Sequence, residues 1–180
     1  SDVTTLNTLD DNTTGAVKAG TITSVTGTLA KLLTAYGSNG ITGLGNEAIA
    51  VSDTTSLAAS DLNSLDSKTS GTVTTSTSLA TLTGTVAALN TAYGSVGLSI
   101  EGDEAITISD TTVDAEALNV LNNYTSGVIN ADTLTKLTGT LVDVNVAFAA
   151  DAPASGATIS GLGDQDVELT DTNILAADLD

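Results

Sequence analysis

The sequence predicts an α/β fold: a repeat solenoid of about six coils, each holding one short helix and two short parallel strands. One motif occurs three times, as LNTLD, LNSLD and LNVLN at Leu6–Asp10, Leu62–Asp66 and Leu118–Asn122, which gives a period of about 56 residues. Each period has two similar halves, since TLTGT at Thr81–Thr85 is followed by TISDT at Thr107–Thr111. A coil of about 28 residues follows from this halving.

The helix of each coil is predicted from the spacing of apolar residues. Leu57, Leu62 and Leu65 lie near one helical face. The next helix follows the same rule, with Val86, Leu89, Ala92 and Tyr93. Gly15, Gly71 and Gly127 each follow a Thr-Thr or Thr-Ser pair, and we expect them to end helices in the left-handed conformation.

The strands are predicted from alternation. Between Glu104 and Ser109 the large aliphatic side chains fall on every second residue, as expected of a strand with one buried face. The same alternation gives Ile49 with Val51 and Val167 with Leu169, and the residues between the aliphatics are Ala50, Thr107 and Glu168. The core predicted for the middle repeat is Leu62, Leu65, Val73, Leu82, Val86, Leu89, Ile106 and Ile108.

We expect one elongated repeat domain over residues 1–180, with units of approximately 1–51, 52–108 and 109–180. The third unit is about five residues longer between Ala147 and Gly161 and carries Pro153, which predicts a surface loop more readily than a binding loop. The chain starts without Met and stops at AADLD, which matches the start of a unit. We therefore expect it to be an excerpt of a longer array.

Composition excludes several classes of function. The formal net charge is −18, and the four basic residues are all Lys, so nucleic acid and anionic membranes lack a cationic face to bind. No apolar run approaches the length that membrane insertion needs. The chain has no His and no Cys, which removes the usual catalytic bases and the preferred zinc ligands. We expect no enzyme activity, and Ca²⁺ is the one candidate cofactor.

Recurrent carboxylates predict a possible Ca²⁺ site. They precede a strand in GNE, GDE and GDQD and follow it in SDT or TDT, at turns where glycine permits tight backbone geometry. The candidate ligands are Glu47, Asp53, Asp103, Glu104, Asp110, Asp164, Asp166 and Asp171. In the alternative interpretation Asp53, Asp110 and Asp171 cap helix N-termini or form Asx turns, and TGT performs the same task without an acid.

The motifs at Leu6–Thr55, from LNTLD through TGT and TAYGS to GLGNEA and SDTT, resemble the Thr/Asn/Gly-rich tandem repeats of giant cell-surface proteins of marine cyanobacteria. Leu98–Glu101 and Phe148–Ser160 depart most from that pattern. The resemblance implies an extracellular or cell-surface location and a role in adhesion or architecture. It carries no catalytic residues.

Together these observations predict a structural segment of a large cell-surface protein, serving as a spacer or adhesin stalk. One alternative is a calcium-binding adhesive module that recognises polysaccharide or a cell surface. Another is a self-assembling extracellular filament, since the ends of an excised repeat array lack polar caps. The expected partners are neighbouring repeats of the same chain, copies of itself, or polysaccharide.

Overall fold

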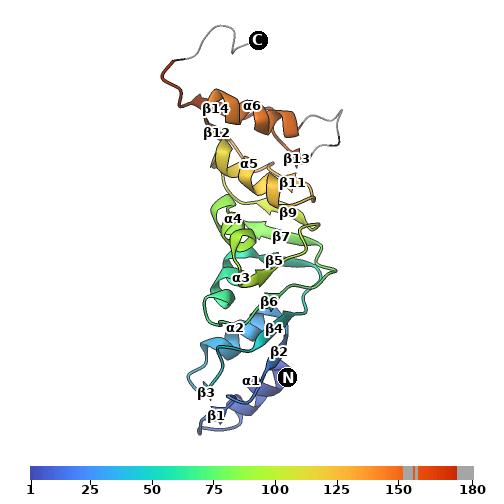
Figure 1. Cartoon of the computed structure of the whole chain (residues 1–180), viewed down its shortest axis with the longest axis vertical. Coiled ribbons are helices and arrows are strands. Elements are labelled where there is room, and N and C mark those ends of the chain that lie inside the picture. The colour runs from blue at the N-terminus through green and yellow to red at the C-terminus, as the bar shows by residue number, and fades with distance from the viewer. Residues whose placement is uncertain (152–155, 157, 174–180) are drawn as a thin grey trace. The chain divides into compact units, whose positions relative to one another are not determined.

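The computed structural model describes residues 1–151, 156 and 158–173 (Figure 1). These residues form an α/β fold with six helices and short strands that pair in parallel. The helices are α1 (Val3–Asp11), α2 (Leu29–Gly37), α3 (Ala59–Asp66), α4 (Val86–Gly94), α5 (Ala115–Tyr124) and α6 (Leu141–Ala150). The strands are β1 (Val17–Lys18), β2 (Ser24–Gly27), β3 (Ile41–Thr42), β4 (Ala48–Val51), β5 (Ser56–Ala58), β6 (Val73–Thr74), β7 (Thr81–Gly84), β8 (Leu98–Ser99), β9 (Ala105–Ile108), β10 (Thr112–Asp114), β11 (Ile129–Asn130), β12 (Lys136–Gly139), β13 (Ile159–Ser160) and β14 (Asp166–Leu169).

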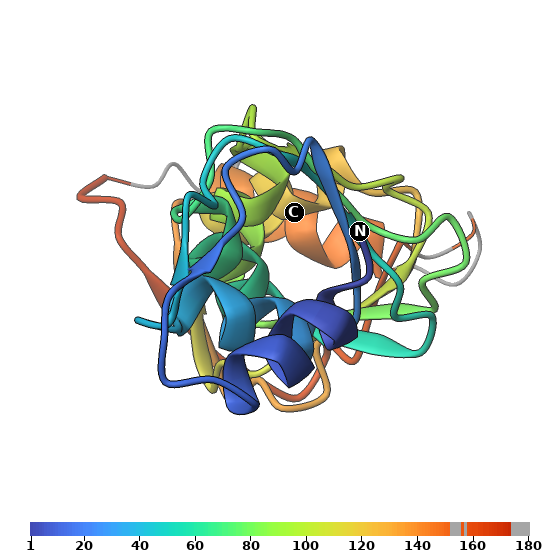
Figure 2. The same cartoon turned by 90° about the horizontal axis from the view of Figure 1, so that it is seen from below.

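The chain divides into two compact units. Unit 1 holds Ser1–Leu82 with Thr91–Glu101, and unit 2 holds Thr83–Asn90 with the residues from Gly102 onward. In unit 1, β1 pairs with β3, and a second sheet has the order β2-β4-β6-β8. Strand β5 of this unit neighbours β7. The residues of β7 are divided between the two units. Figure 2 shows α1 and α2 of this unit side by side. In unit 2 the strand orders are β9-β11-β13 and β10-β12-β14.

The helices recur at nearly the predicted interval, because their first residues stand 26 to 30 positions apart. The prediction of two strands per coil is correct only for alternate intervals. Two strands separate α1 from α2, α3 from α4 and α5 from α6, whereas three strands lie in each of the other two intervals. The additional strands are β5 and β10, which directly precede α3 and α5. Sequence alternation missed them because a strand of three residues contains too few positions to display a period.

The predicted aliphatic core is confirmed, since all eight residues expected for the middle repeat are buried. Ile49 and Val51 are also buried in β4, as their alternation predicted. Two details differ from prediction. Leu57 lies in β5 and not in a helix, and Val167 in β14 is exposed.

The prediction of left-handed helix-ending glycines was wrong. Gly15, Gly71 and Gly127 do not have positive φ angles. Gly71 is required for a different reason: a Cβ atom there would lie 2.1 Å from the carbonyl oxygen of Glu47. At Gly127 the same atom would lie 2.0 Å from the carbonyl oxygen of Glu104. Close approach between neighbouring backbones, and not chain reversal, therefore excludes a side chain at these two positions.

Strand register locates the longer third repeat. Ile49 pairs with Val73 and Ile106 with Ile129, but Ile129 pairs with Ile159, so more residues separate the last two partners. The predicted loop around Pro153 and the AADLD segment lie outside the described residues. Among the helices of the described part of the chain, none has the length and apolarity needed to cross a membrane.

Candidate functional site

Five of the eight carboxylates singled out in the sequence lie in three turns, which we call the acidic turns: residues 45–47, 102–104 and 163–166. The first two turns precede β4 and β9 and hold buried side chains, because Glu47 is 1% exposed and Glu104 is 3% exposed. Burial of a carboxylate is costly unless hydrogen bonds replace the lost water. The contacts of these side chains therefore decide what the turns do.

Glu47 is surrounded by donors from its own unit. The Gly45 N–H lies 2.9 Å from Oε1 and 3.0 Å from Oε2, and the Asn46 N–H lies 3.2 Å from Oε2. The Tyr36 hydroxyl, at the end of α2, also donates to Oε1. Both carboxylate oxygens are thus hydrogen-bonded inside the protein, which offsets the desolvation of the charge.

Tyr36 belongs to the TAYGS motif, which places its ring beside the first acidic turn. Burial, and then the hydrogen bond to Glu47, raise the pKa of the Tyr36 hydroxyl above its ordinary value. The hydroxyl acts as a donor to the Glu47 carboxylate.

The third acidic turn replaces this arrangement with a neutral one. Gln165 stands where the first two turns have Glu47 and Glu104, and Oε1 of Gln165 accepts from the Gly163 N–H at 2.6 Å. The aromatic residue of the same repeat is Phe148, whereas Tyr36 and Tyr93 occupy that position in the repeats with glutamate. Tyrosine therefore accompanies glutamate and phenylalanine accompanies glutamine. This signal is present in the sequence, but the aromatic and the acid belong to different motifs, TAYGS and GNE, so the spacing within either motif does not show it.

A Thr-Ser-Gly segment holds each of the first two turns, and we call it the clasp. In unit 1 the Ser70 N–H donates to the Gly45 carbonyl at 2.8 Å, and the Thr69 hydroxyl lies 3.4 Å from the Glu47 carbonyl. In unit 2 the clasp is Thr125–Gly127, where the Ser126 N–H donates to the Gly102 carbonyl at 2.7 Å. Within each clasp the glycine N–H donates to the threonine hydroxyl at 2.9 Å. The Thr-Ser-Gly motif thus connects two segments of chain.

Three of the candidate metal ligands cap helices, which confirms the capping interpretation. Asp53, Asp110 and Asp171 each accept from the first backbone N–H of a helix, and the helix is the one that begins 24 to 30 residues earlier. The pairs are Leu29 N to Asp53 at 2.7 Å, Val86 N to Asp110 at 2.8 Å and Leu141 N to Asp171 at 2.7 Å. A carboxylate in this position satisfies an unpaired donor and interacts favourably with the helix dipole.

The remaining candidates, Asp103, Asp164 and Asp166, are exposed. Within the ranges that the structure describes, no group of three or more acidic side chains is arranged to hold a metal ion. Calcium binding at the turns stays a prediction. Hydrogen bonds already engage Glu47 and the three capping aspartates, so a cation there would compete with the chain's own donors.

Sequence reasoning missed a further set of polar contacts between helices, made by asparagines that follow a leucine. In unit 1 the Asn7 side-chain amide donates to the Lys31 carbonyl of α2 at 3.0 Å. In unit 2, Asn90 donates to Ala117 at 2.9 Å, and Asn119 donates to Asp143 at 2.9 Å. We call this series the asparagine ladder. Its signal was the Leu-Asn pair, which occurs in the LN motifs of Asn7 and Asn119 and again at Leu89–Asn90.

The site residues are therefore used for contacts between segments of the chain itself. Buried glutamates, capping aspartates and helix asparagines all bond to backbone groups. Comparison of the chain with protein-family models, curated proteins and solved structures finds no match.

Proposed function

We propose that the chain is a repeat solenoid that serves as a non-enzymatic structural segment, a spacer or adhesin stalk, of a large extracellular or cell-surface protein. The observation that carries this proposal is the direction of the polar contacts. The clasp, the aspartate caps and the asparagine ladder each join residues 22 to 30 positions apart, the distance of one coil. Side chains that an enzyme would direct at a ligand here bond to backbone groups of the chain itself.

The strand register supports the solenoid within each unit. Parallel partners such as Ile49 and Val73 in unit 1, or Ile106 and Ile129 in unit 2, lie one coil apart. Parallel pairing between consecutive coils requires a crossover that carries the helix, as in stacked repeat proteins. A coil, from one helix to the next, is then the unit of assembly.

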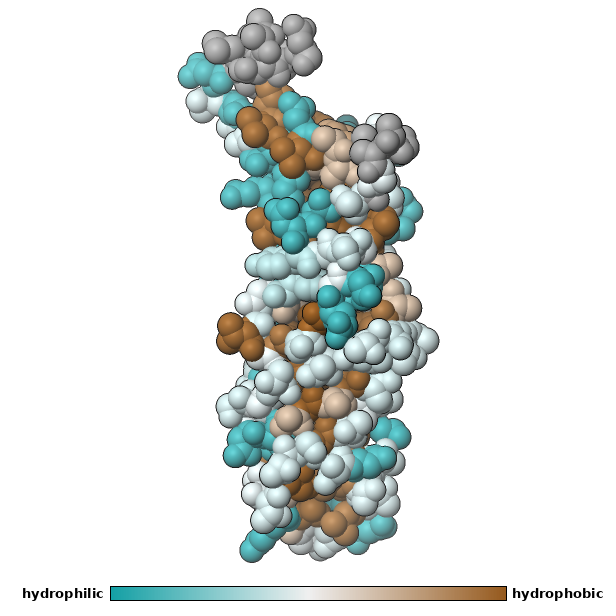
Figure 3. Space-filling view, turned by 45° about the vertical axis from the view of Figure 1, so that its right-hand side comes forward, coloured by the Kyte–Doolittle hydropathy of each residue, from teal (hydrophilic) through white to brown (hydrophobic). Residues whose placement is uncertain are grey.

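The surface is consistent with a role outside the cell. Pale and teal residues cover most of the face shown in Figure 3, which reflects a composition rich in Thr, Ser and Asp. Most of the 22 acidic residues have no basic partner, because the chain holds only 4 Lys. A highly charged surface keeps a protein soluble, and salt screens the repulsion between its carboxylates.

Small-angle X-ray scattering of the dilute chain tests the structural part of the proposal. A compact globule of this length has a radius of gyration of roughly 16 Å. We expect a clearly larger value and a pair-distance distribution with a long tail, because the proposed coils add along one axis. A radius near that of the globule would contradict the solenoid.

Two further measurements address location and calcium. Antibodies raised against the purified chain are expected to label intact, unpermeabilised cells of the organism that makes it, and labelling only after permeabilisation would contradict a surface location.

Thermal melts in chelator and in millimolar Ca²⁺, with Mg²⁺ matched, are expected to coincide. A rise in Tm with Ca²⁺ alone would favour the calcium-binding alternative, since a ligand that binds only the native state stabilises it.

A further inference from the structure

We propose that Asn39 and Gly40 form a self-modification site. The Asn39 side chain cyclises onto the Gly40 nitrogen and opens to isoaspartate, while Asp10 draws the proton from that nitrogen through Ser38. All four residues belong to unit 1. We call the series Asp10, Ser38 and Gly40 the proton relay. This reaction of the chain with itself needs no ligand, and it goes beyond the structural role proposed above.

The proton relay is a chain of two hydrogen bonds in the loop between α2 and β3. The Gly40 N–H donates to the Ser38 hydroxyl oxygen at 2.9 Å, and that hydroxyl donates to Oδ2 of Asp10 at 2.6 Å. Asp10 lies near the end of α1, 28 residues before the serine. A nitrogen whose proton points at a hydroxyl backed by a carboxylate has the arrangement of a nucleophile beside its general base.

Asn39 supplies the carbonyl that the nitrogen attacks. Its side chain is exposed, so water reaches it. Asn-Gly pairs are common in two-residue hairpin turns, where both residues need a positive φ angle. Neither Asn39 nor Gly40 has a positive φ angle, and the loop joins a helix to a strand that pairs in parallel. A hairpin turn therefore does not explain the asparagine.

A second copy of the relay in unit 1 shows that the fold does not need an amide at this place. The Ser95 hydroxyl donates to Oδ2 of Asp66 at 2.7 Å and accepts from the Gly97 N–H at 3.1 Å. The residue between this serine and this glycine is Val96, which is fully exposed. Position 39 is therefore free of a packing role, and its amide is available for chemistry.

The glycine of the pair follows from the relay itself. A Cβ atom at Gly40 would overlap the Asp10 carboxylate, as one at Gly97 would overlap Asp66. Glycine also leaves its own backbone nitrogen open to approach, because it has no side chain to shield it. Packing thus places an unhindered nucleophile directly after the asparagine.

The reaction balances with water as its only co-reactant. The Gly40 nitrogen passes its proton to Ser38, whose own proton moves to Asp10, and the nitrogen attacks Cγ of Asn39. The bond between Cγ and the side-chain amide nitrogen breaks, and ammonia leaves with the returned proton. Water then opens the five-membered imide at either carbonyl, which gives aspartate or isoaspartate.

Isoaspartate would alter a strand contact of the first coil. The main chain then runs through Cγ of residue 39 and gains one carbon just before Gly40. The Gly40 carbonyl accepts from the Val17 N–H at 2.8 Å, and Val17 is in register with Ile41 of β3. A longer chain at this point displaces the carbonyl and loosens β1 from β3 irreversibly. The strand pair would thus record the age of the molecule.

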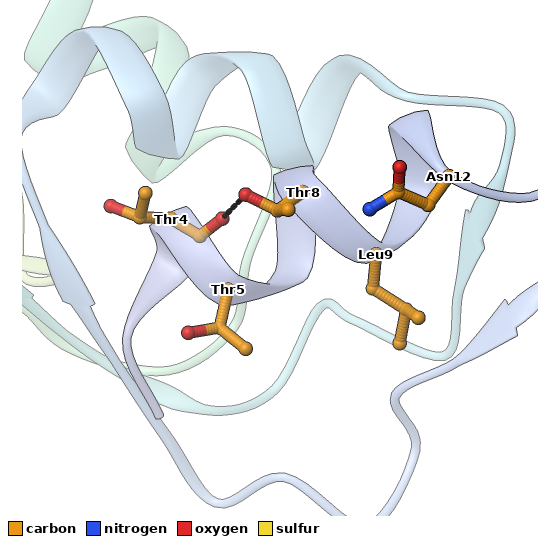
Figure 4. Close-up of a pocket in the computed structure, with 5 residues that line it drawn as sticks. All are labelled: Thr4, Thr5, Thr8, Leu9 and Asn12. Atoms are coloured by element: carbon orange, nitrogen blue, oxygen red, sulfur yellow. Dashed lines mark hydrogen bonds between the residues drawn. The ribbon is translucent and has the colours of Figure 1, made fainter.

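The proton relay is separate from an open pocket on the same helix. Figure 4 shows the side chains that line this pocket along α1, which are Thr4, Thr5, Thr8, Leu9 and Asn12. Asp10 is not among them, and the Thr8 hydroxyl donates within the helix to the Thr4 carbonyl at 2.8 Å. We therefore assign no step of the reaction to the pocket.

Peptide mapping of the native chain after incubation at neutral pH tests the proposal, with chromatography to separate the isoaspartyl peptide. Asp10→Asn is the decisive variant, because the new amide still accepts from the Ser38 hydroxyl but is no base. Asn122 is the natural residue at this place of the third LN motif, so the fold accommodates it. We expect Asn39 to convert at least about tenfold more slowly, since a positioned base typically contributes about 100-fold or more.

Asp11→Asn is the matched control, because it removes the neighbouring exposed charge and no contact of the proton relay. We expect it to convert like wild type, and both variants to keep the wild-type thermal melt. Equal or faster conversion in Asp10→Asn would overturn the proposal, because the hydrogen bond would then protect the Gly40 nitrogen. Conversion of native wild type no faster than that of the urea-unfolded chain would also overturn it.

Val96→Asn tests the reaction as a gain of function, since the second relay has the same hydrogen bonds around a residue without an amide. We expect the introduced amide to convert at a rate similar to that of Asn39, and to slow when Asp66→Asn is added. An introduced amide that stays intact would overturn the role of the relay. Hydrogen exchange at Val17 measures the consequence, and unchanged protection in the converted fraction would overturn the loosening of β1.

Discussion

The first and third acidic turns have the same backbone role but different chemistry. Glu47 carries a buried charge that accepts from the Tyr36 hydroxyl, whereas Gln165 is a neutral amide in a repeat whose aromatic is Phe148. Removal of the hydroxyl thus coincides with removal of the charge. The difference teaches that these turns need an acceptor for the glycine N–H, and that in the first turn the carboxylate acceptor is matched by a tyrosine hydroxyl.

What the two turns share lies just beyond them. Asp53 and Asp171 both cap, at 2.7 Å, a helix that begins 24 to 30 residues earlier. The shared contact joins segments far apart in the sequence, whereas the differing one joins the turn to the helix just before it. We therefore expect substitutions of the clasp and the turn interior to have larger effects than substitutions of the caps.

Gly71→Ala should have the largest effect. The new Cβ atom would lie 2.1 Å from the Glu47 carbonyl oxygen, which is backbone and cannot swing away. Overpacking of this kind costs about 3 kcal/mol in the free energy of unfolding. Urea denaturation measures it. Gly15→Ala is the control and should cost less than about 0.5 kcal/mol, and equal losses in the two variants would argue against the clasp.

Tyr36→Phe should have the second-largest effect. It turns the first acidic turn into a Phe-with-Glu combination that no repeat of this chain contains. The buried Glu47 carboxylate loses a donor, at a cost of about 2 kcal/mol. Chemical denaturation at pH 7 provides the measurement, and an unchanged midpoint would show that the hydroxyl is dispensable.

The double substitution Tyr36→Phe with Glu47→Gln should recover most of this loss, because it reproduces the chemistry of the third turn. We expect a stability within about 1 kcal/mol of wild type. A double-mutant cycle at pH 7 gives the coupling energy directly. Purely additive losses would mean that the match between the aromatic and the turn residue has no energetic basis.

Alkaline pH should destabilise the protein more when the first turn keeps its Tyr36–Glu47 pair than when it carries the Phe and Gln of the third turn. The folded-state pKa of Tyr36 is raised above its ordinary value of 10.0, so the contribution of this group to stability is complete below pH 10 and is lost as the pH rises above it. The slope for one such group is at most about 1.4 kcal/mol per pH unit, and solvent screening of the half-buried ring reduces it. Melts between pH 8 and 11 should show a shallower decline for the Tyr36→Phe, Glu47→Gln variant. Parallel curves would contradict the raised pKa.

Asp53→Ala and Asp171→Ala should have the smallest effects. Each removes one cap, at a cost of about 1 kcal/mol. Because the two caps have the same geometry, the two losses should be similar, even though the turns before them differ. Thermal melts of both variants test this expectation, and a much larger loss for either one would indicate a role beyond capping.

The sequence predicted the helix interval, the aliphatic core and the parallel α/β class, because each depends on a repeated spacing of apolar residues. Leu62, Leu89 and Ile106 are buried as their periodicity required. It did not predict that Gly71 marks a close backbone approach, since glycine serves several purposes and its partner is 24 residues away.

The sequence identified which residues form the candidate site but not which contacts they make. Hydrogen bonding explains the buried Glu47, but nothing in the triplet GNE distinguishes a buried carboxylate from a solvated one. The partner of Asp53 is the Leu29 N–H, and a helix end in another coil has no local sequence signature. The periodic spacing of residues therefore did not predict the hydrogen bonds between segments far apart in the sequence.

The alternation of two and three strands between helices has a consequence for how such a chain can change length in evolution. The strand that directly precedes a helix is β2 before α2 but β5 before α3, and β4 and not β5 is the partner of β2. Adjacent intervals between helices therefore differ, and the pattern of strands returns only after two of them. Recombination between repeats should conserve this pattern when it inserts or deletes about 56 residues. A gain or loss of about half that length would place two intervals of the same type in succession.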